Sequence, residues 1–137
     1  MTVLVVGVPE GEELERLRAR IQSDPRFRVI SHADEPAVAL AHARALLPDV
    51  TVLALPDGLA SLATDPGVLG VFRGVRALDP PSGVVLRTPA DGGPAPVFDL
   101  AVEGAVHVVR DGDPDGLASA LRTIGLRRAS CDPDGSH

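Results

Sequence analysis

Pro48-Asp49-Val50-Thr51-Val52-Leu53-Ala54-Leu55-Pro56-Asp57-Gly58 is the stretch that decides the fold of this chain. Its six central residues, 50–55, are aliphatic or β-branched and lie between two breaks that contain proline. Such a run is typical of a strand buried on both faces at the centre of a parallel sheet. Open α/β sheets bind ligands beyond the carboxyl ends of their strands. Chemistry here would therefore need a reactive side chain near residues 54–56, and the sequence offers none there.

Outward from this run, apolar segments alternate with amphipathic ones and predict four more strands and five helices. We expect the other strands at residues 3–6, 27–31, 84–86 and 105–109. We expect helices at 9–23, 34–47, 66–78 and 97–103, with a last one beginning near Asp113, and loops at 56–64 and 88–96. This alternation predicts an α/β fold with a doubly wound, five-stranded parallel sheet in the flavodoxin-like order 2-1-3-4-5.

The same patterns predict which side chains form the core. In the strand at 27–31, Phe27, Val29 and Ser31 should share one side of the sheet. The expected sheet core is Val5, Val29, Val52, Leu53, Val85 and Val108. The expected apolar faces of the helices are Val38, Leu40, Ala41, Ala45 and Leu46 in the second, Val68, Leu69, Phe72, Val75 and Leu78 in the third, and Leu117, Ala120, Leu121 and Ile124 in the last.

Composition limits the classes of function. The 137 residues suit one domain, which we place at 1–126, followed by a flexible tail at 127–137. The net charge of −6, with arginine as the only long basic residue type, disfavours nucleic-acid binding. A single cysteine, Cys131, cannot form an internal disulfide and suits a reducing cytoplasm. The sequence contains no signal peptide and no apolar run long enough for a membrane span.

Three segments, in order and at near-family spacing, carry a likeness to a known family. Residues 48–54 are similar to its "PDVVLLD" strand, residues 104–111 to "GAxGYLLKD", and residues 113–122 to "SPEELLAAIR". Over about residues 1–126, the chain resembles the receiver domains of bacterial two-component response regulators. It is most similar to those that precede a helix-turn-helix output domain. The resemblance implies a CheY-like fold and a role in signalling or transcription control.

The resemblance also implies that the phosphorylation site is lost. The acid pair that holds Mg²⁺ in the family falls on Gly7 and Val8, the phosphate-accepting aspartate on Ala54, and the lysine on Arg110. Only the hydroxyl residue survives, as Thr88. Mg²⁺ prefers carboxylate oxygens, and an alanine offers no nucleophile. Neither Glu10 nor Asp57 stands at a matching position, so we expect a pseudo-receiver with no metal and no cofactor.

Other chemistry finds little support. The turn at 7–11 lacks both Gly-rich nucleotide-binding patterns, and its acids would repel a phosphate or a flavin mononucleotide. The cobalamin-binding pattern Asp-x-His-x-x-Gly is also absent. Neighbouring Ser31 and His32 point to opposite faces of a strand, so they cannot form a catalytic pair. The four histidines are His32, His42, His107 and His137, and none has a second histidine or a cysteine two to four residues away. We therefore expect no enzyme.

Two hypotheses remain. In the first, the chain binds a protein partner, or a second copy of itself, independently of phosphate. The resemblance places this contact on the fourth helix, the fifth strand and the fifth helix, near Val97, Phe98, Val102, His107, Arg110 and Leu117. In the second, an apolar crevice binds a small molecule and is lined by Gly7, Val8, Ala54, Leu55 and Thr88. The arginine pair at 127–128 either marks a linker to an output domain or simply ends a helix.

Overall fold

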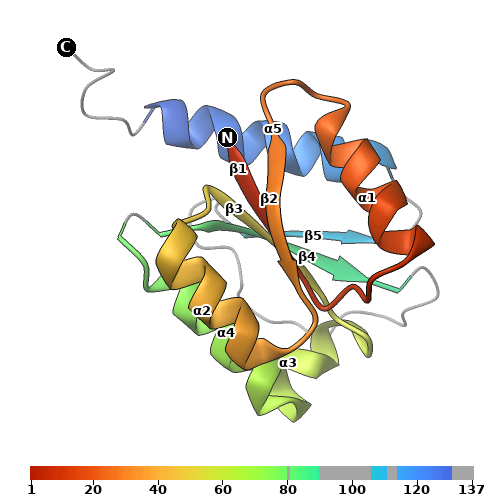
Figure 1. Ribbon diagram of the computed structural model, residues 1–137, viewed down its shortest axis with the longest axis vertical. Helices are drawn as coiled ribbons and strands as arrows, with labels where there is room; N and C mark the ends of the chain where they lie inside the picture. The colour runs from red at the N-terminus through yellow and green to blue at the C-terminus, as the bar shows by residue number, and fades with distance from the viewer. Residues whose placement is uncertain (80, 90–105, 111–113, 131–137) are drawn as a thin grey trace.

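A five-stranded parallel sheet forms the centre of the protein (Figure 1). The computed structural model describes residues 1–79, 81–89, 106–110 and 114–130. The strand order β2-β1-β3-β4-β5 confirms the predicted flavodoxin-like fold. The strands are β1 (Thr2–Val6), β2 (Arg28–Ala33), β3 (Val50–Ala54), β4 (Gly83–Thr88) and β5 (Val106–Arg110). As the sequence predicted, the run at 50–55 contains the central strand, β3.

Helices cover both faces of the sheet (Figure 1). On one face lie α1 (Glu12–Gln22) and α5 (Pro114–Ser130), and on the other lie α2 (Pro36–Leu46), α3 (Ser61–Thr64) and α4 (Pro66–Arg76). The expected loop at 56–64 is wrong, because a 3₁₀ turn, η1 (Gly58–Ala60), leads into α3. Both elements are too short to show a helical period in the sequence. The expected helix at 97–103 lies outside the described residues.

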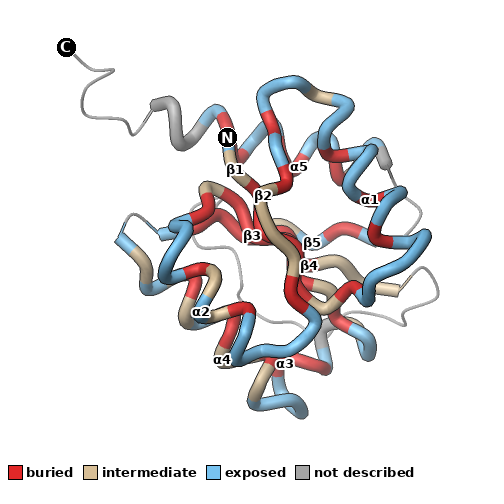
Figure 2. The backbone as a smooth tube through the Cα atoms, viewed as in Figure 1, coloured by how far each residue is buried: buried red, intermediate tan, exposed pale blue. Residues whose placement is uncertain are grey.

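The core consists of two layers, one on each face of the sheet (Figure 2). Five of the six predicted core residues are buried, but Val108 is 47% exposed and that prediction is wrong. Val108 lies on β5, the last strand of the sheet, where a side chain has a strand neighbour on one side only. Val106 and Val109 are the buried residues of this strand.

Of the predicted apolar face of the second helix, only Leu40 packs against the core, and the other four positions are wrong. The structure buries Ala39 and Ala43 of α2, whereas Val38 is 43% exposed. The helix carries apolar residues almost all round, so their spacing does not select one face. Packing against α4 selects it instead: a Cβ added to Gly74 would lie only 2.2 Å from Cδ2 of Leu40. The remaining predicted positions, Ala41, Ala45 and Leu46, are exposed.

A register shift reverses the expected orientation of Ser31. Val3 of β1 pairs with Val29 of β2, but the next residue, Leu4, pairs with Ser31. The extra residue, Ile30, forms an irregularity that moves Ser31 to the other face, toward α2. The prediction that Val29 and Ser31 share a side is therefore wrong.

The last helix, α5, packs on the core with the face that the sequence predicted. Helix α5 continues through Ser130, past the domain boundary expected at residue 126. Its buried residues include all four that the sequence predicted, Leu117, Ala120, Leu121 and Ile124. None of the helices within the described ranges combines the length and apolar character that a membrane span requires.

Candidate functional site

A cavity of about 200 Å³ lies at the carboxyl ends of β1, β3 and β4. Four of the five residues predicted for the degenerate phosphorylation pocket line it, namely Gly7, Val8, Ala54 and Thr88. The other lining residues are Pro9, Glu13, Leu55, Pro56, Arg87 and Pro89. The fifth predicted residue, Arg110, is exposed at the end of β5 and pairs in register with Thr88. The sequence thus predicted some of the lining residues of this cavity but not the charged ones, Glu13 and Arg87.

Gly7 and Ala54 form a close backbone contact at the base of this cavity. The amide of Gly7 donates a hydrogen bond to the carbonyl of Ala33 at 2.9 Å, and its φ of 85° lies in the region that favours glycine. A Cβ at position 7 would lie 3.3 Å from the carbonyl oxygen of Ala54. An aspartate here would therefore be strained, and Val8 beside it is buried. Backbone strain at position 7 and burial at position 8 therefore both disfavour an acid pair here.

An ion pair crosses the cavity wall, and sequence reasoning missed it. Nη1 of Arg87 lies 3.0 Å from Oε1 of Glu13, in the first turn of α1. Arg87 pairs in register with Ala54, so its guanidinium emerges beside the position of the family's acceptor aspartate. The Arg87 side chain is only 13% exposed, whereas that of Glu13 is 56% exposed. The predicted strand ended at Leu86, but β4 continues to Thr88 and carries Arg87 to this edge.

Thr88 has a structural bond of its own. Its hydroxyl donates to the backbone carbonyl of Val109 at 3.1 Å and so joins the ends of β4 and β5. The Thr88 hydroxyl, which the resemblance matches to the family's hydroxyl residue, therefore points toward β5. Its oxygen can still accept a hydrogen bond.

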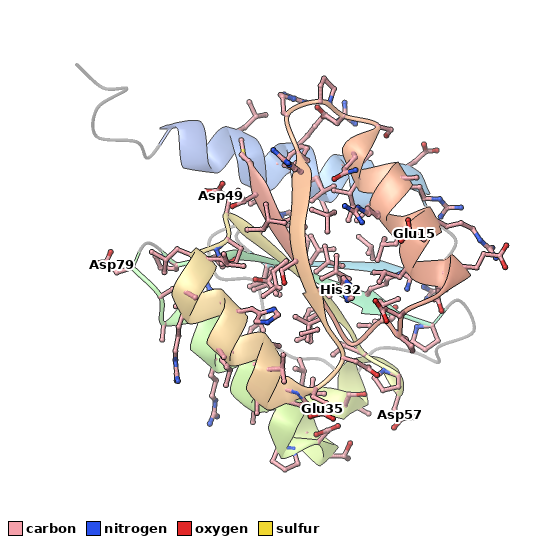
Figure 3. All side chains as sticks on the ribbon, in the orientation of Figure 1. Glu15, His32, Glu35, Asp49, Asp57 and Asp79 are labelled. Atoms are coloured by element: carbon pink, nitrogen blue, oxygen red, sulfur yellow. The ribbon has the colours of Figure 1, made fainter. Side chains whose placement is uncertain are left out.

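The acids near this edge do not gather into a metal site. Glu10 and Asp57 are both exposed, and Figure 3 shows Asp57 at the end of the molecule where β3 finishes. Oε1 of Glu10 lies 3.8 Å from Nε2 of His32, and the amide of Asp57 donates to Oγ of Ser61 at 3.0 Å. Within the described ranges, no three His, Cys, Asp or Glu residues are placed to hold a metal ion. The donor set that Mg²⁺ prefers is not assembled by these residues.

The structure pairs one histidine with a serine in a way the sequence did not indicate. Oγ of Ser31 lies 2.7 Å from Nδ1 of His42, and both side chains are half-buried between β2 and α2. The register shift in β2 brings them together, and no local spacing in the sequence signals it. This bond links a helix to the edge strand, away from the cavity lining.

The predicted interaction face is described only in part. Val97, Phe98 and Val102 lie outside the described residues. Arg110 is exposed and His107 is half-buried. The inclusion of Leu117 is a mistake, because the inward face of α5 buries its side chain in the core and leaves it unavailable to a partner. Exposed Val108 lies between His107 and Arg110 on β5 and was not predicted.

Solved receiver domains share this architecture. The chain is similar to the response regulator domain of Thermotoga maritima CheB, with a TM-score of 0.67 and 16% identity over 91% of this chain and 96% of that one. It is similar to the pseudo-receiver domain of the CikA protein, with a TM-score of 0.55 and 22% identity over 90% and 96%.

A third similar structure is RcsB from Salmonella enterica serovar Typhimurium, solved bound to a promoter. Its TM-score is 0.65, with 18% identity over 98% of this chain and 69% of that chain. No protein-family model and no curated protein matches the sequence. At these identities the likeness establishes the receiver fold, and function has to be argued from the site.

Proposed function

We propose that this chain is a receiver-like regulatory module of the bacterial cytoplasm that acts by binding a protein partner or a second copy of itself. Its binding does not depend on phosphorylation, and it catalyses no reaction. The observation that supports the proposal is the wall of the cavity: it contains Ala54, which the resemblance matches to the acceptor aspartate, and the Arg87–Glu13 ion pair lies beside it. An alanine cannot accept a phosphoryl group.

The surface that we assign to the partner centres on β5. The exposed Val108 and Arg110 lie on this strand with the half-buried His107. The resemblance assigns Val97, Phe98 and Val102 to the same surface, and these three lie outside the described residues. Strand β5 is the last strand of the described sheet, and an edge strand offers unpaired backbone groups to a partner. The exposed Val108 adds an apolar side chain to this edge. We assign this surface to a protein, and not to a nucleic acid or a membrane, in keeping with the net charge of −6.

Self-association and partner capture test the proposal. Sedimentation of the full chain measures the dimer, and affinity capture identifies a partner. We expect Val108→Asp to abolish whichever complex forms. Val38→Asp, which changes an almost equally exposed valine on α2, should leave the complex intact. Acetyl phosphate should not alter either result. A protein that remains monomeric and captures no partner contradicts the proposal.

The cavity favours a second candidate function, the sensing of a small molecule. Its volume of about 200 Å³ and its mixed apolar and charged wall suit a ligand smaller than a drug. We expected an apolar crevice, and the Arg87–Glu13 pair adds two charged groups to its wall. A thermal-shift screen of metabolites tests this candidate. If no compound raises the melting temperature, the candidate is removed.

A further inference from the structure

We propose that the cavity binds small organic carboxylates, which replace the carboxylate of Glu13 on the guanidinium of Arg87. The inference rests on the second candidate function and supplies its ligand class. Arg87 is the only cationic residue that lines the described cavity, and a side chain of this protein already places a carboxylate against it. The geometry of a bound acid is therefore present in the structure.

Arg87 is suited to be the anchor. It is 13% exposed and emerges from the end of β4, a strand held by neighbours on both sides. A guanidinium fixed in this way presents donors that match a carboxylate, at little cost in side-chain entropy. Partial shielding from water strengthens the attraction relative to an exposed pair.

Glu13 is suited to leave. Its side chain is 56% exposed, and it stands in the first turn of α1. The helix is fixed to the sheet by other residues, the buried Leu14, Leu17 and Ile21. Glu13 can therefore turn into water without disturbing the core. Ion pairs with an exposed partner are weak, so a ligand has little to overcome.

The rest of the wall sets the ligand's size and chemistry. Apolar side chains flank the ion pair, from Val8, Pro9, Leu55, Pro56 and Pro89. A cavity of about 200 Å³ has room for roughly six to eight non-hydrogen atoms, at about 30 Å³ for a water-sized unit. An acid with a short hydrocarbon chain satisfies both the guanidinium and the apolar wall. A phosphate dianion fits this wall less well, because one lining cation, Arg87, would have to balance two negative charges. The apolar wall and the nearby Glu13 carboxylate would also disfavour it.

The test is a titration of the full chain followed by amide NMR signals of Gly7, Ala54 and Thr88. The probes are butyrate, its neutral analogue butyramide, and inorganic phosphate. We expect saturable shifts with butyrate, and much weaker effects with the other two. Arg87→Gln should weaken butyrate binding at least about 10-fold, as expected for the loss of a charged hydrogen bond. Glu13→Gln should tighten binding roughly 2- to 5-fold, because the internal competitor is gone.

Glu12→Gln is the matched control. Glu12 forms an equally short 3.0 Å ion pair with Arg16, but both side chains are largely exposed and neither lines the cavity. This variant should bind butyrate as the unmodified chain does. Circular dichroism checks that Arg87→Gln folds. If that variant is unfolded, the tightening in Glu13→Gln decides the test.

Several results would overturn the carboxylate inference. The inference fails if phosphate binds as tightly as butyrate. It also fails if folded Arg87→Gln binds butyrate as the unmodified chain does, or if Glu13→Gln does not bind butyrate more tightly. Butyramide binding as well as butyrate would reject the ligand class but leave the second candidate function standing. If no probe shifts these three signals, the inference fails, and the metabolite screen decides the candidate function separately.

Discussion

The two ends of the sheet hold carboxylates in opposite ways. Where β1 and β3 begin, Asp49 accepts hydrogen bonds from the amide and hydroxyl of Thr2 at 2.8 and 3.2 Å, and its own amide donates to that hydroxyl at 3.1 Å (Figure 3). Where the strands finish, Glu13 lies mostly in water and forms an ion pair across the wall of a cavity. The amide and hydroxyl of Thr2 fix the first carboxylate, whereas the second can exchange its partner.

This difference suggests a structural role for the end of the sheet where the strands begin and a binding role for the end where they finish. Asp49 belongs to the segment that resembles the receiver family, and its bonds fix the start of the central strand. Ligands of open α/β sheets bind at the opposite end. There the resemblance sets the family's acids at Gly7, Val8 and Ala54, and these three residues line the cavity. On our proposal, the chain shares the fold of receiver domains but differs in chemistry at the carboxyl ends of the strands.

The largest effect is expected between the two ends, in the centre of β3. Leu53 is almost fully buried in the layer that faces α2 and α4. Leu53→Ala should lower the free energy of unfolding by about 2–5 kcal/mol, through lost transfer energy and a new cavity. Urea denaturation measures this change. A loss below about 1 kcal/mol would mean that β3 is not central.

Asp49→Ala sharpens the comparison between the ends. We expect a loss of about 1–3 kcal/mol in unfolding free energy, because the amide and hydroxyl of Thr2 lose a half-buried partner. Glu13→Ala is the matched carboxylate variant at the other end and should cost below about 1 kcal/mol. The same denaturation assay applies to both. Equal losses would contradict the division between a fixed and an exchangeable carboxylate.

Gly7→Ala tests whether the backbone disfavours a side chain at position 7. Position 7 has a φ of 85° and a neighbouring carbonyl within 3.3 Å of a new Cβ. We expect a loss of about 1–2 kcal/mol in stability, the cost of a left-handed conformation with a side chain. Gly11→Ala separates backbone strain from the close contact. Its φ of 149° also lies in the range that disfavours a side chain, but no atom lies within 4 Å of the added Cβ. An unchanged melting temperature for Gly7→Ala would remove the argument from backbone strain.

The smallest effect concerns Asp24, a half-buried carboxylate in the turn before β2. Hydrogen bonds from the Arg26 side chain, at 2.7 and 3.0 Å, and then from its amide lower the pKa of Asp24 to about 2. The resulting stabilisation is present above the ordinary pKa of 3.8 and is lost as the pH falls through about 2. NMR titration should show this low midpoint, and Arg26→Ala should return it toward 3.8. A midpoint unaffected by Arg26→Ala would refute the assigned cause.

The sequence predicted the sheet well because burial on both faces leaves a plain signal. The run from Val50 to Ala54 needs no partner elsewhere in the chain to be recognised as a strand. Ser31 and His42 meet only because β2 slips by one residue against β1, which depends on long-range pairing. The exposure of Val108 likewise depends on its place in the sheet.

For the candidate site too, the sequence predicted some residues and missed others. Gly7, Val8, Ala54 and Thr88 were placed by their likeness to a family pattern, and the structure brings them to one cavity. The Arg87–Glu13 pair joins residues 74 positions apart, so no local spacing reveals it. Its available signal was modest: an arginine one residue before Thr88, at the end of a strand.

Incubation with acetyl phosphate and Mg²⁺, followed by intact mass and melting temperature, tests the central claim most directly. A working receiver would gain roughly 80 daltons, the mass of one phosphoryl group. Ala54 offers no acceptor, and Gly7 with Val8 offers no carboxylate for the metal. We predict no mass increase and no Mg²⁺-dependent change in melting temperature. A stable phosphoryl adduct on Asp57, or on any other residue, would show that the site has been rebuilt and would contradict a phosphorylation-independent module.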